Sequence, residues 1–159
     1  MGDVKDQTAG KRQPTVTPCL CAALRQASRA VTRIYDAELR ETGLRTTQHA
    51  LLKLLGRAGE VRQSDLGEMA SLDDTTLTRG LRPLVKGGWV TIRPGSDRRE
   101  KLVAITEAGK EKVEEVRAAW LRAQERMRRA LPDGTWKLLF EALPEVAKAA
   151  SKAMSGDAS

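Results

Sequence analysis

Apolar residues recur every three or four positions over the first part of the chain, a spacing that gathers them on one face of a helix. The series comprises Leu20, Leu24, Ala27, Val31 and Ile34. Thr17 and Pro18 precede it and are typical of a helix start, because threonine caps the first turn and proline loses nothing at the first helical position. The pattern predicts a long amphipathic helix that starts at Pro18 and is stopped by Gly43.

Three shorter helices are expected next. One is capped by Thr46 and Thr47 and ends by Gly59, and another covers about residues 64–70. The third begins after Asp73, an acidic residue of the kind that caps helices well.

This third helix runs to about Lys86, where Gly87 and Gly88 supply the left-handed turn that commonly closes a helix. Pro83 lies inside it and removes one backbone hydrogen bond. Two interpretations follow from the sequence: the helix bends near Pro83, or it ends early.

A β-hairpin is expected after the glycine pair. Residues 89–93 and 99–105 are rich in β-formers, and Pro94 to Asp97 between them have the composition of a turn. Thr106 then caps a helix with a three-four apolar series, broken at residues 132–134 by Pro-Asp-Gly. A last helix carries a second apolar face with Trp136, Leu139, Phe140, Leu143, Val146, Ala147 and Ala150.

The two ends of the chain are therefore long amphipathic helices with too little other chain to cover them. Closed twofold dimers are the commonest soluble oligomers, so a second copy of the chain is the simplest cover. No apolar run approaches the length of a membrane span, and the first 17 residues are polar rather than a secretory signal. We expect a cytoplasmic protein with no membrane partner.

Positive charge is concentrated in one segment. The formal net charge is +7, and seven basic residues against two acidic ones lie between Thr75 and Lys101. Such a local excess favours a polyanionic partner.

The helix after Asp73 presents residues suited to reading DNA. Its leucines point to the core, which leaves short hydroxyls and arginines outward: Thr75, Thr76, Thr78, Arg79 and Arg82. Threonine can bond a base or a phosphate, and arginine can pair bidentately with guanine in the major groove. A merely solvated helix face is the alternative, but the basic hairpin that follows favours DNA.

The hairpin tip carries Asp97, Arg98 and Arg99. A narrow basic tip can insert an arginine into the minor groove, where the negative potential is strongest over A·T-rich stretches. We expect Asp97 to pair with Arg99 and to aim its guanidinium group.

An enzyme is not expected. The chain has one histidine, His49, and two cysteines, Cys19 and Cys21, from which no nucleophile–base pair can be assembled. Metal binding is disfavoured too, because residues two apart on a helix point about 200° away from each other. We predict no metal and no cofactor.

The stretch from Leu77 to Ile105 and beyond resembles the MarR family of bacterial regulators. The likeness rests on Leu77-Thr78-Arg79, Gly88-Trp89-Val90, Asp97-Arg98-Arg99 and Ile105-Thr106-Glu107-Ala108-Gly109. The resemblance implies a dimer, a winged helix-turn-helix module in each subunit, and a roughly palindromic double-stranded DNA operator. It also implies that Gln63, at the start of a helix, contacts the phosphate backbone and that a small-molecule effector or cysteine oxidation releases the DNA.

The resemblance implies a fold class that is mainly α with a small β-hairpin wing. It divides the chain into a flexible tail (1–17), an N-terminal dimerisation helix (18–45), the winged helix-turn-helix domain (46–106), C-terminal dimerisation helices (107–154) and a second flexible tail (155–159).

The segment around Cys21 is also similar to the OhrR branch of organic-peroxide sensors. Leu20-Cys21-Ala22-Ala23-Leu24 carries the likeness, and Tyr35 stands where those sensors place a tyrosine that bonds the thiolate. With Thr17 as the cap, Cys19 and Cys21 fall in the first helical turn, where the helix dipole favours a thiolate. Arg25 and His49 replace two further tyrosines. A thiol switch and inert, half-buried cysteines both remain open.

The function expected from the sequence is a dimeric, sequence-specific transcriptional regulator, with repression as the expected action. The competing hypothesis is an architectural protein that binds nucleic acid without sequence preference through the same basic residues.

Overall fold

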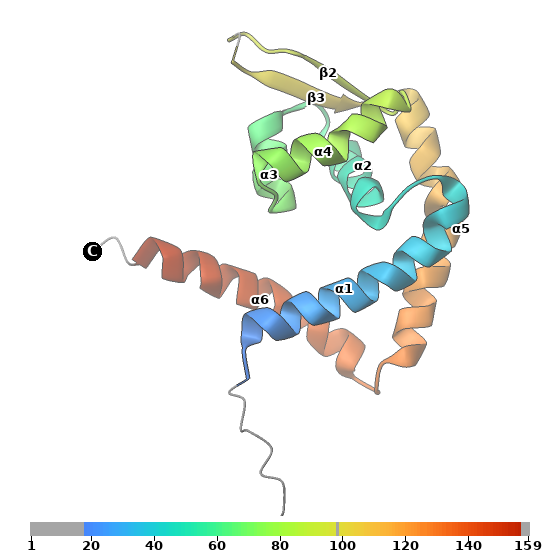
Figure 1. Cartoon of the computed structure of the whole chain (residues 1–159), viewed down its shortest axis with the longest axis vertical. Coiled ribbons are helices and arrows are strands. Elements are labelled where there is room, and N and C mark those ends of the chain that lie inside the picture. The colour runs from blue at the N-terminus through green and yellow to red at the C-terminus, as the bar shows by residue number, and fades with distance from the viewer. Residues whose placement is uncertain (1–17, 98, 157–159) are drawn as a thin grey trace, which may run out of the picture.

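The computed structural model describes residues 18–97 and 99–156. Three long helices, the first and the last two of the chain, form arms, and a compact module with a projecting hairpin lies at one side of them (Figure 1). In chain order the elements are α1 (Leu20–Leu39), a 3₁₀ turn η1 (Arg40–Thr42), α2 (Thr46–Ala58), β1 (Val61–Arg62), α3 (Gln63–Ala70), α4 (Asp74–Lys86), β2 (Val90–Pro94), β3 (Lys101–Ile105), α5 (Glu107–Ala130) and α6 (Thr135–Gly156). The predicted fold class, mainly helical with a small β wing, is confirmed.

The sheet has one strand more than the sequence predicted. The strand order is β1-β3-β2, and both pairings are antiparallel. β1 contributes two residues, with Val61 opposite Val103 and Arg62 opposite Leu102. Two residues show no alternation of apolar and polar side chains, so β1 had no signal of its own.

The start of α1 differs from the prediction. The helix begins at Leu20, and Cys19 is its N-cap with extended backbone angles. Cys21 is therefore the second residue of the helix, within the first turn as predicted, whereas Cys19 lies just before the helix. The predicted cap Thr17 lies outside the described residues, as does the N-terminal tail 1–17.

The cap of α2 comes from another helix. Asp36 on α1 accepts hydrogen bonds at 2.7 Å from both the backbone N–H and the hydroxyl of Thr46. Arg45, and not a threonine, is the N-cap residue. This contact ties the module to the arm, and the ten-residue separation hides it from local sequence patterns.

The ends of α4 follow the sequence closely. Asp73 caps the helix by accepting the backbone N–H of Thr76 at 2.9 Å. The helix continues past Pro83 to Lys86, so the interpretation that it ends early is wrong. Of the two glycines that follow, Gly88 is the one in the left-handed conformation, with φ of 73°.

Thr106 joins the wing to α5. Its hydroxyl donates to the carbonyl of Gly88 at 2.7 Å and accepts the N–H of Gly109 at 3.0 Å, which confirms the predicted cap. A Cβ atom on Gly109 would lie 2.2 Å from the carbonyl oxygen of Trp89. Only glycine allows this close approach of helix and wing.

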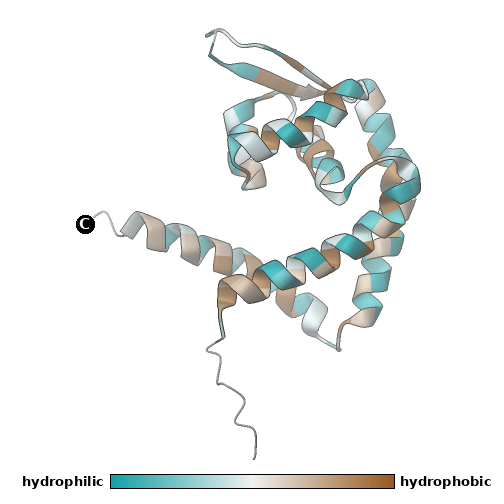
Figure 2. Ribbon diagram, viewed as in Figure 1, coloured by the Kyte–Doolittle hydropathy of each residue, from teal (hydrophilic) through white to brown (hydrophobic). Residues whose placement is uncertain are grey.

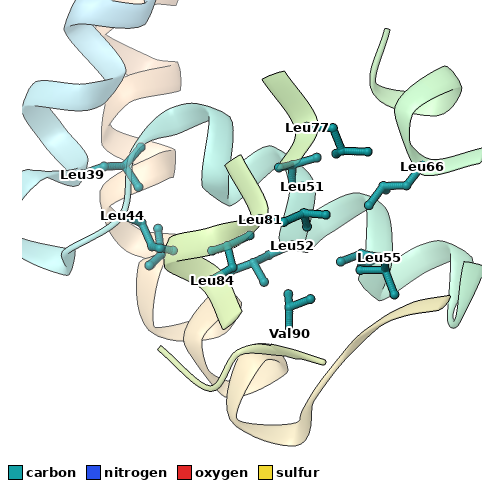
Figure 3. Packing of buried hydrophobic residues seen from close by; sticks show 12 residues of the cluster. Leu39, Leu44, Leu51, Leu52, Leu55, Leu66, Leu77, Leu81, Leu84 and Val90 are labelled. Carbon is teal, nitrogen blue, oxygen red and sulfur yellow. The ribbon is translucent and has the colours of Figure 1, made fainter. Parts of the chain in front are cut away.

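A leucine-rich core lies within the module (Figure 3). The fully buried leucines of α2, α3 and α4 interlock with Val90 and Val103 of the wing, and all of these are at most 2% exposed. The same cluster extends to Leu39 of α1 and Val116 of α5. Outside the module, Glu38 on α1 binds Arg122 and Arg126 of α5 at 3.4 and 3.3 Å. Helix α6 continues through Gly156, two residues into the expected tail 155–159, and residues 157–159 are outside the described part.

Candidate nucleic-acid interface

Helix α4 separates its apolar and polar residues as the sequence predicted. Leu77 and Leu81 are each 1% exposed and Leu84 is 0% exposed. All five candidate reading residues lie exposed on the same helix: Thr75, Thr76, Thr78, Arg79 and Arg82. The core therefore holds one side of α4 and leaves the other side available to a partner.

Gln63 does not lie on that surface. It is 8% exposed, and its Nε2 donates to Asp74 Oδ1 at 3.0 Å and to Thr78 Oγ1 at 3.2 Å. The side-chain amine is thus used within the protein. In this structure the Gln63 side chain holds α4 against α3, and the expected phosphate contact at this residue stays a prediction.

The first turn of α4 is fixed by Asp73. Its Oδ2 accepts the hydroxyl of Thr76 at 2.6 Å, and its Oδ1 accepts the backbone N–H of the same residue. These hydrogen bonds, chiefly the one from the Thr76 hydroxyl, hold the pKa of Asp73 below its usual value. The cap is therefore an ionised carboxylate at neutral pH.

Ion pairs anchor the base of the wing. Arg93 on β2 donates from Nε to Glu60 at 2.8 Å, and this contact lowers the pKa of the Glu60 carboxyl. Arg62 binds Asp65 at 2.9 Å and lies 3.8 Å from Glu100. These arginines are occupied with intramolecular partners.

The tip of the wing is shaped by Asp97, although not as predicted. Asp97 Oδ1 accepts the backbone N–H of Arg99 at 2.9 Å, and its carbonyl accepts the N–H of Glu100 at 2.9 Å. Asp97 therefore holds the turn and does not aim the Arg99 guanidinium group, because a short side chain two residues away bonds the nearer backbone donor. Arg98 lies outside the described residues.

The outward arginines of α4 and the wing share one surface. Within residues 18–97 and 99–156, none of the ion pairs involves Arg79, Arg82 or Arg99. A hollow of about 470 Å³ between α4 and the wing is lined by Arg79, Arg82 and Lys101, together with Ile92. A neighbouring hollow of about 620 Å³ brings Arg99 to the α3–α4 edge. Arg79, Arg82, Arg99 and Lys101 together are called the cationic face here, although Glu68, Asp74 and Glu100 also line the second hollow.

The C-terminal helix presents a surface of another kind. None of the 22 residues of α6 is buried, although the helix is amphipathic. Figure 2 shows hydrophobic residues along α6 and at the start of α1. The large apolar side chains exposed on these two helices are Leu20, Leu24, Leu138, Leu139, Phe140, Leu143 and Met154.

A third feature lies where the module meets the arms. A hollow of about 470 Å³ is lined by Tyr35 of α1, His49 and Lys53 of α2, and Trp120 of α5. The rings of His49 and Trp120 are 6.2 Å apart, and Lys53 Nζ lies 4.2 Å from the Trp120 ring centroid. Burial, and then the charge of Lys53, lower the pKa of His49, so the imidazole is neutral at pH 7. No local sequence pattern predicts a pocket from these residues, because they come together only through tertiary packing.

The cysteines and Tyr35 are far apart within one subunit. Cys19 and Cys21 are both exposed in the single chain. Tyr35 follows Cys21 by fourteen residues on the same helix, a separation of roughly 21 Å at 1.5 Å per residue. A bond between the Cys21 thiolate and a Tyr35 hydroxyl therefore requires two subunits.

Neither a metal site nor a membrane-spanning helix is found among the described residues. Among them, no three His, Cys, Asp or Glu side chains gather as a metal site would require. No described helix combines the length and apolar character needed to cross a membrane.

Comparison with known proteins identifies similar regulators. The model of the MarR family matches residues 44–101. The helix-turn-helix transcriptional regulator YwoH of Bacillus subtilis is 30% identical over 104 residues, which cover 65% of this chain and 76% of YwoH. The regulator SarZ of Staphylococcus saprophyticus is 30% identical over 102 residues, covering 64% of this chain and 70% of SarZ.

Solved structures share the fold. The M. tuberculosis regulator MosR in complex with DNA has a TM-score of 0.75 and 26% identity, and the match covers 86% of this chain and 98% of that one. A mutant of E. coli MarR complexed with operator DNA has a TM-score of 0.70 and 23% identity, covering 80% of this chain and 92% of that one. These likenesses extend beyond the segment from 44 to 101 to the arms.

Proposed function

The chain belongs to the MarR family of transcriptional regulators, and from this premise we propose that it is a dimeric repressor of a roughly palindromic DNA operator. The observation that carries the proposal is the cationic face, on which Arg79 and Arg82 of α4 and Arg99 of the wing make no ion pair with any described residue. Arginine in the major groove reads guanine, and arginine at a wing tip suits the minor groove.

Dimerisation is supported by the apolar residues of α1 and α6. A helix of 22 residues with an apolar face and no buried residue lacks the packing that normally stabilises a helix. A second copy supplies a matching face by twofold symmetry. The pair would then present two α4 helices about one DNA turn apart, roughly 34–36 Å.

Release of DNA by a small effector is the regulation that we propose first. The hollow lined by His49, Lys53 and Trp120 supports it, because it combines aromatic surface with a cation at the junction of module and arms. Oxidation of Cys21 is the alternative, supported by the exposure of its thiol near the start of α1.

The DNA proposal is tested by gel-shift titration on the region upstream of the protein's own gene, with random DNA as competitor. Arg79→Ala and Arg99→Ala are each expected to weaken binding by about 1–3 kcal/mol, and the Arg79 variant also relaxes sequence preference. Arg117→Ala is the charge-matched control, since Arg117 lies on α5 and pairs with Glu114. Parent-like binding by both test variants contradicts the proposal.

The same titration separates the alternatives. If random DNA competes as well as the upstream region, the protein is an architectural binder. Addition of an organic hydroperoxide then distinguishes the two switches. Release that disappears in Cys21→Ser identifies a thiol switch, whereas indifference to peroxide favours the effector.

A further inference from the structure

Two threonines of α4 carry hydroxyl groups with opposite hydrogen-bonding capacity. We propose that Thr78 donates its hydroxyl proton to a DNA phosphate, whereas Thr76 contacts only hydrogen-bond donors, which on the major-groove edge are the amino groups of cytosine and adenine. The proposal rests on the proposed function, in which α4 enters the major groove, and assigns each residue a chemical partner there.

Thr76 has already used its proton. A threonine hydroxyl has one proton to donate and two lone pairs. The hydroxyl lies 2.6 Å from Asp73 Oδ2, and a carboxylate can only accept, so Thr76 is the donor of that bond. The lowered pKa of Asp73 keeps the carboxylate ionised. Thr76 thus offers lone pairs alone, and it has no proton to donate to a phosphate oxygen.

Thr78 keeps its proton because Gln63 donates to it. The side-chain nitrogen and oxygen of a glutamine are hard to distinguish, but its neighbours here decide the matter. The atom 3.2 Å from Thr78 Oγ1 is also 3.0 Å from Asp74 Oδ1. Since that carboxylate oxygen accepts only, the shared atom is the amide nitrogen, and its second N–H donates to Thr78. The proton of Thr78 remains free for an acceptor.

The two residues lie on opposite flanks of the exposed face. At 100° per residue, Thr76 and Thr78 are 200° apart around the helix axis, and Thr75 and Arg79 lie between them on the side away from the core. Each flank of a helix in the major groove lies beside a sugar-phosphate wall and close to the outer base edges of the groove floor. One flank of α4 is therefore able to bind phosphate, and the other is restricted to base amino groups.

The experiment begins with selection of binding sites from a random duplex pool by the full-length protein. If no sequence is enriched, the proposed function fails, and this inference fails with it. If a site emerges, single phosphates are replaced by neutral methylphosphonates, and single adenines or cytosines by analogues without the amino group. Affinities of the parent, Thr78→Val and Thr76→Val are then compared, with Thr47→Val as control because Thr47 is exposed on α2.

We expect one methylphosphonate substitution to weaken DNA binding by the parent about tenfold, which is the size of a hydrogen bond to a charged group. The same substitution should not weaken DNA binding by Thr78→Val any further. One amino deletion should weaken the parent and leave Thr76→Val unaffected. Gln63→Met should weaken DNA binding several-fold when it is introduced into the parent, but only slightly when it is introduced into Thr78→Val. The assignment is overturned if Thr76→Val is the variant that becomes insensitive to a methylphosphonate, or if neither variant changes any sensitivity while melting like the parent.

Discussion

The winged module and helix α6 use similar apolar side chains in opposite ways. In the module, Leu52, Leu55 and Leu84 are 0% exposed and interlock around one core (Figure 3). In α6, Leu138 and Phe140 are 60% and 63% exposed, and no residue of the helix is buried. The module buries these apolar side chains within one chain, whereas the apolar side chains of α6 stay exposed.

This difference separates two tasks. A closed core keeps α4 and the wing in fixed relative positions, as a reading surface requires. In the proposed dimer, the open apolar face would bring two such surfaces together at a set spacing. The predictions below test this division by disturbing one region and measuring the other.

The largest effect is expected from Phe140→Asp on α6. A charge at the centre of the apolar face should convert the dimer to a monomer, and operator affinity should fall by about 100-fold or more, since the second half-site no longer adds avidity. Sedimentation velocity and gel shifts measure the two effects. Glu145→Lys, which lies about 140° around the helix from Phe140, is the control and should remain dimeric. A Phe140→Asp dimer of parental affinity would show that α6 is not the interface.

The next largest effect is expected inside the module. Leu81→Ala should lower the free energy of unfolding by about 2–5 kcal/mol, because it leaves a cavity in a leucine core. The adjacent Arg82→Ala should leave thermal unfolding unchanged and weaken DNA binding. If Arg82→Ala destabilises the fold as strongly as Leu81→Ala, the two sides of α4 are not separate in function.

Gly109→Ala tests the connection between the wing and α5. The added methyl group would overlap the carbonyl oxygen of Trp89 and approach Ile105 within 2.7 Å. We expect a loss of about 1–3 kcal/mol in unfolding free energy, typical of overpacking. Differential scanning calorimetry measures it, with Ala108→Ser on the exposed side of the same turn as control. A Gly109→Ala melting curve equal to that of the parent would contradict the close packing.

The smallest effect concerns the arm. Hydrogen bonds from Arg128 and then Arg129 lower the pKa of Glu125 from 4.5 to about 2. Because this folded-state pKa is lowered, the stabilisation is complete above the ordinary pKa of 4.5 and is lost as the pH falls toward about 2. Melting temperatures of the parent and Glu125→Gln, measured from about pH 6 to about pH 2, should converge over this window. Both partners are exposed, so the difference will be small, and a constant gap at all pH values would refute the assignment.

Much of the fold was predictable because its signals are local. Asp73 and Thr106 each mark a helix start, and each caps its helix through a hydrogen bond to a residue three positions later. The spacing of Leu77, Leu81 and Leu84 determines which side of α4 faces outward. The same spacing identified the outward threonines and arginines. Local chemistry thus sufficed for helix ends and for the direction of the reading surface.

The structure adds to or departs from the sequence predictions where a side chain bonds a distant or unexpected partner. Asp36 caps a helix ten residues away, and Gln63 reaches across to α4. Asp97 bonds a backbone N–H where a guanidinium partner was expected. In each case several acceptors or donors were available in the sequence, and only the folded geometry selects one. The hollow at Trp120 was unpredictable for the same reason.

The central claim, two reading helices held at a fixed spacing by a symmetric dimer, is tested most directly by changing the spacing of the DNA. Selected half-sites would be placed in inverted repeat about one helical turn apart, and about five further base pairs, half a turn, would then be inserted between them. The account predicts tight binding of the first duplex and a loss of about 100-fold for the second, because half a turn moves one site to the opposite side of the DNA. Equal affinity for the two duplexes would contradict it.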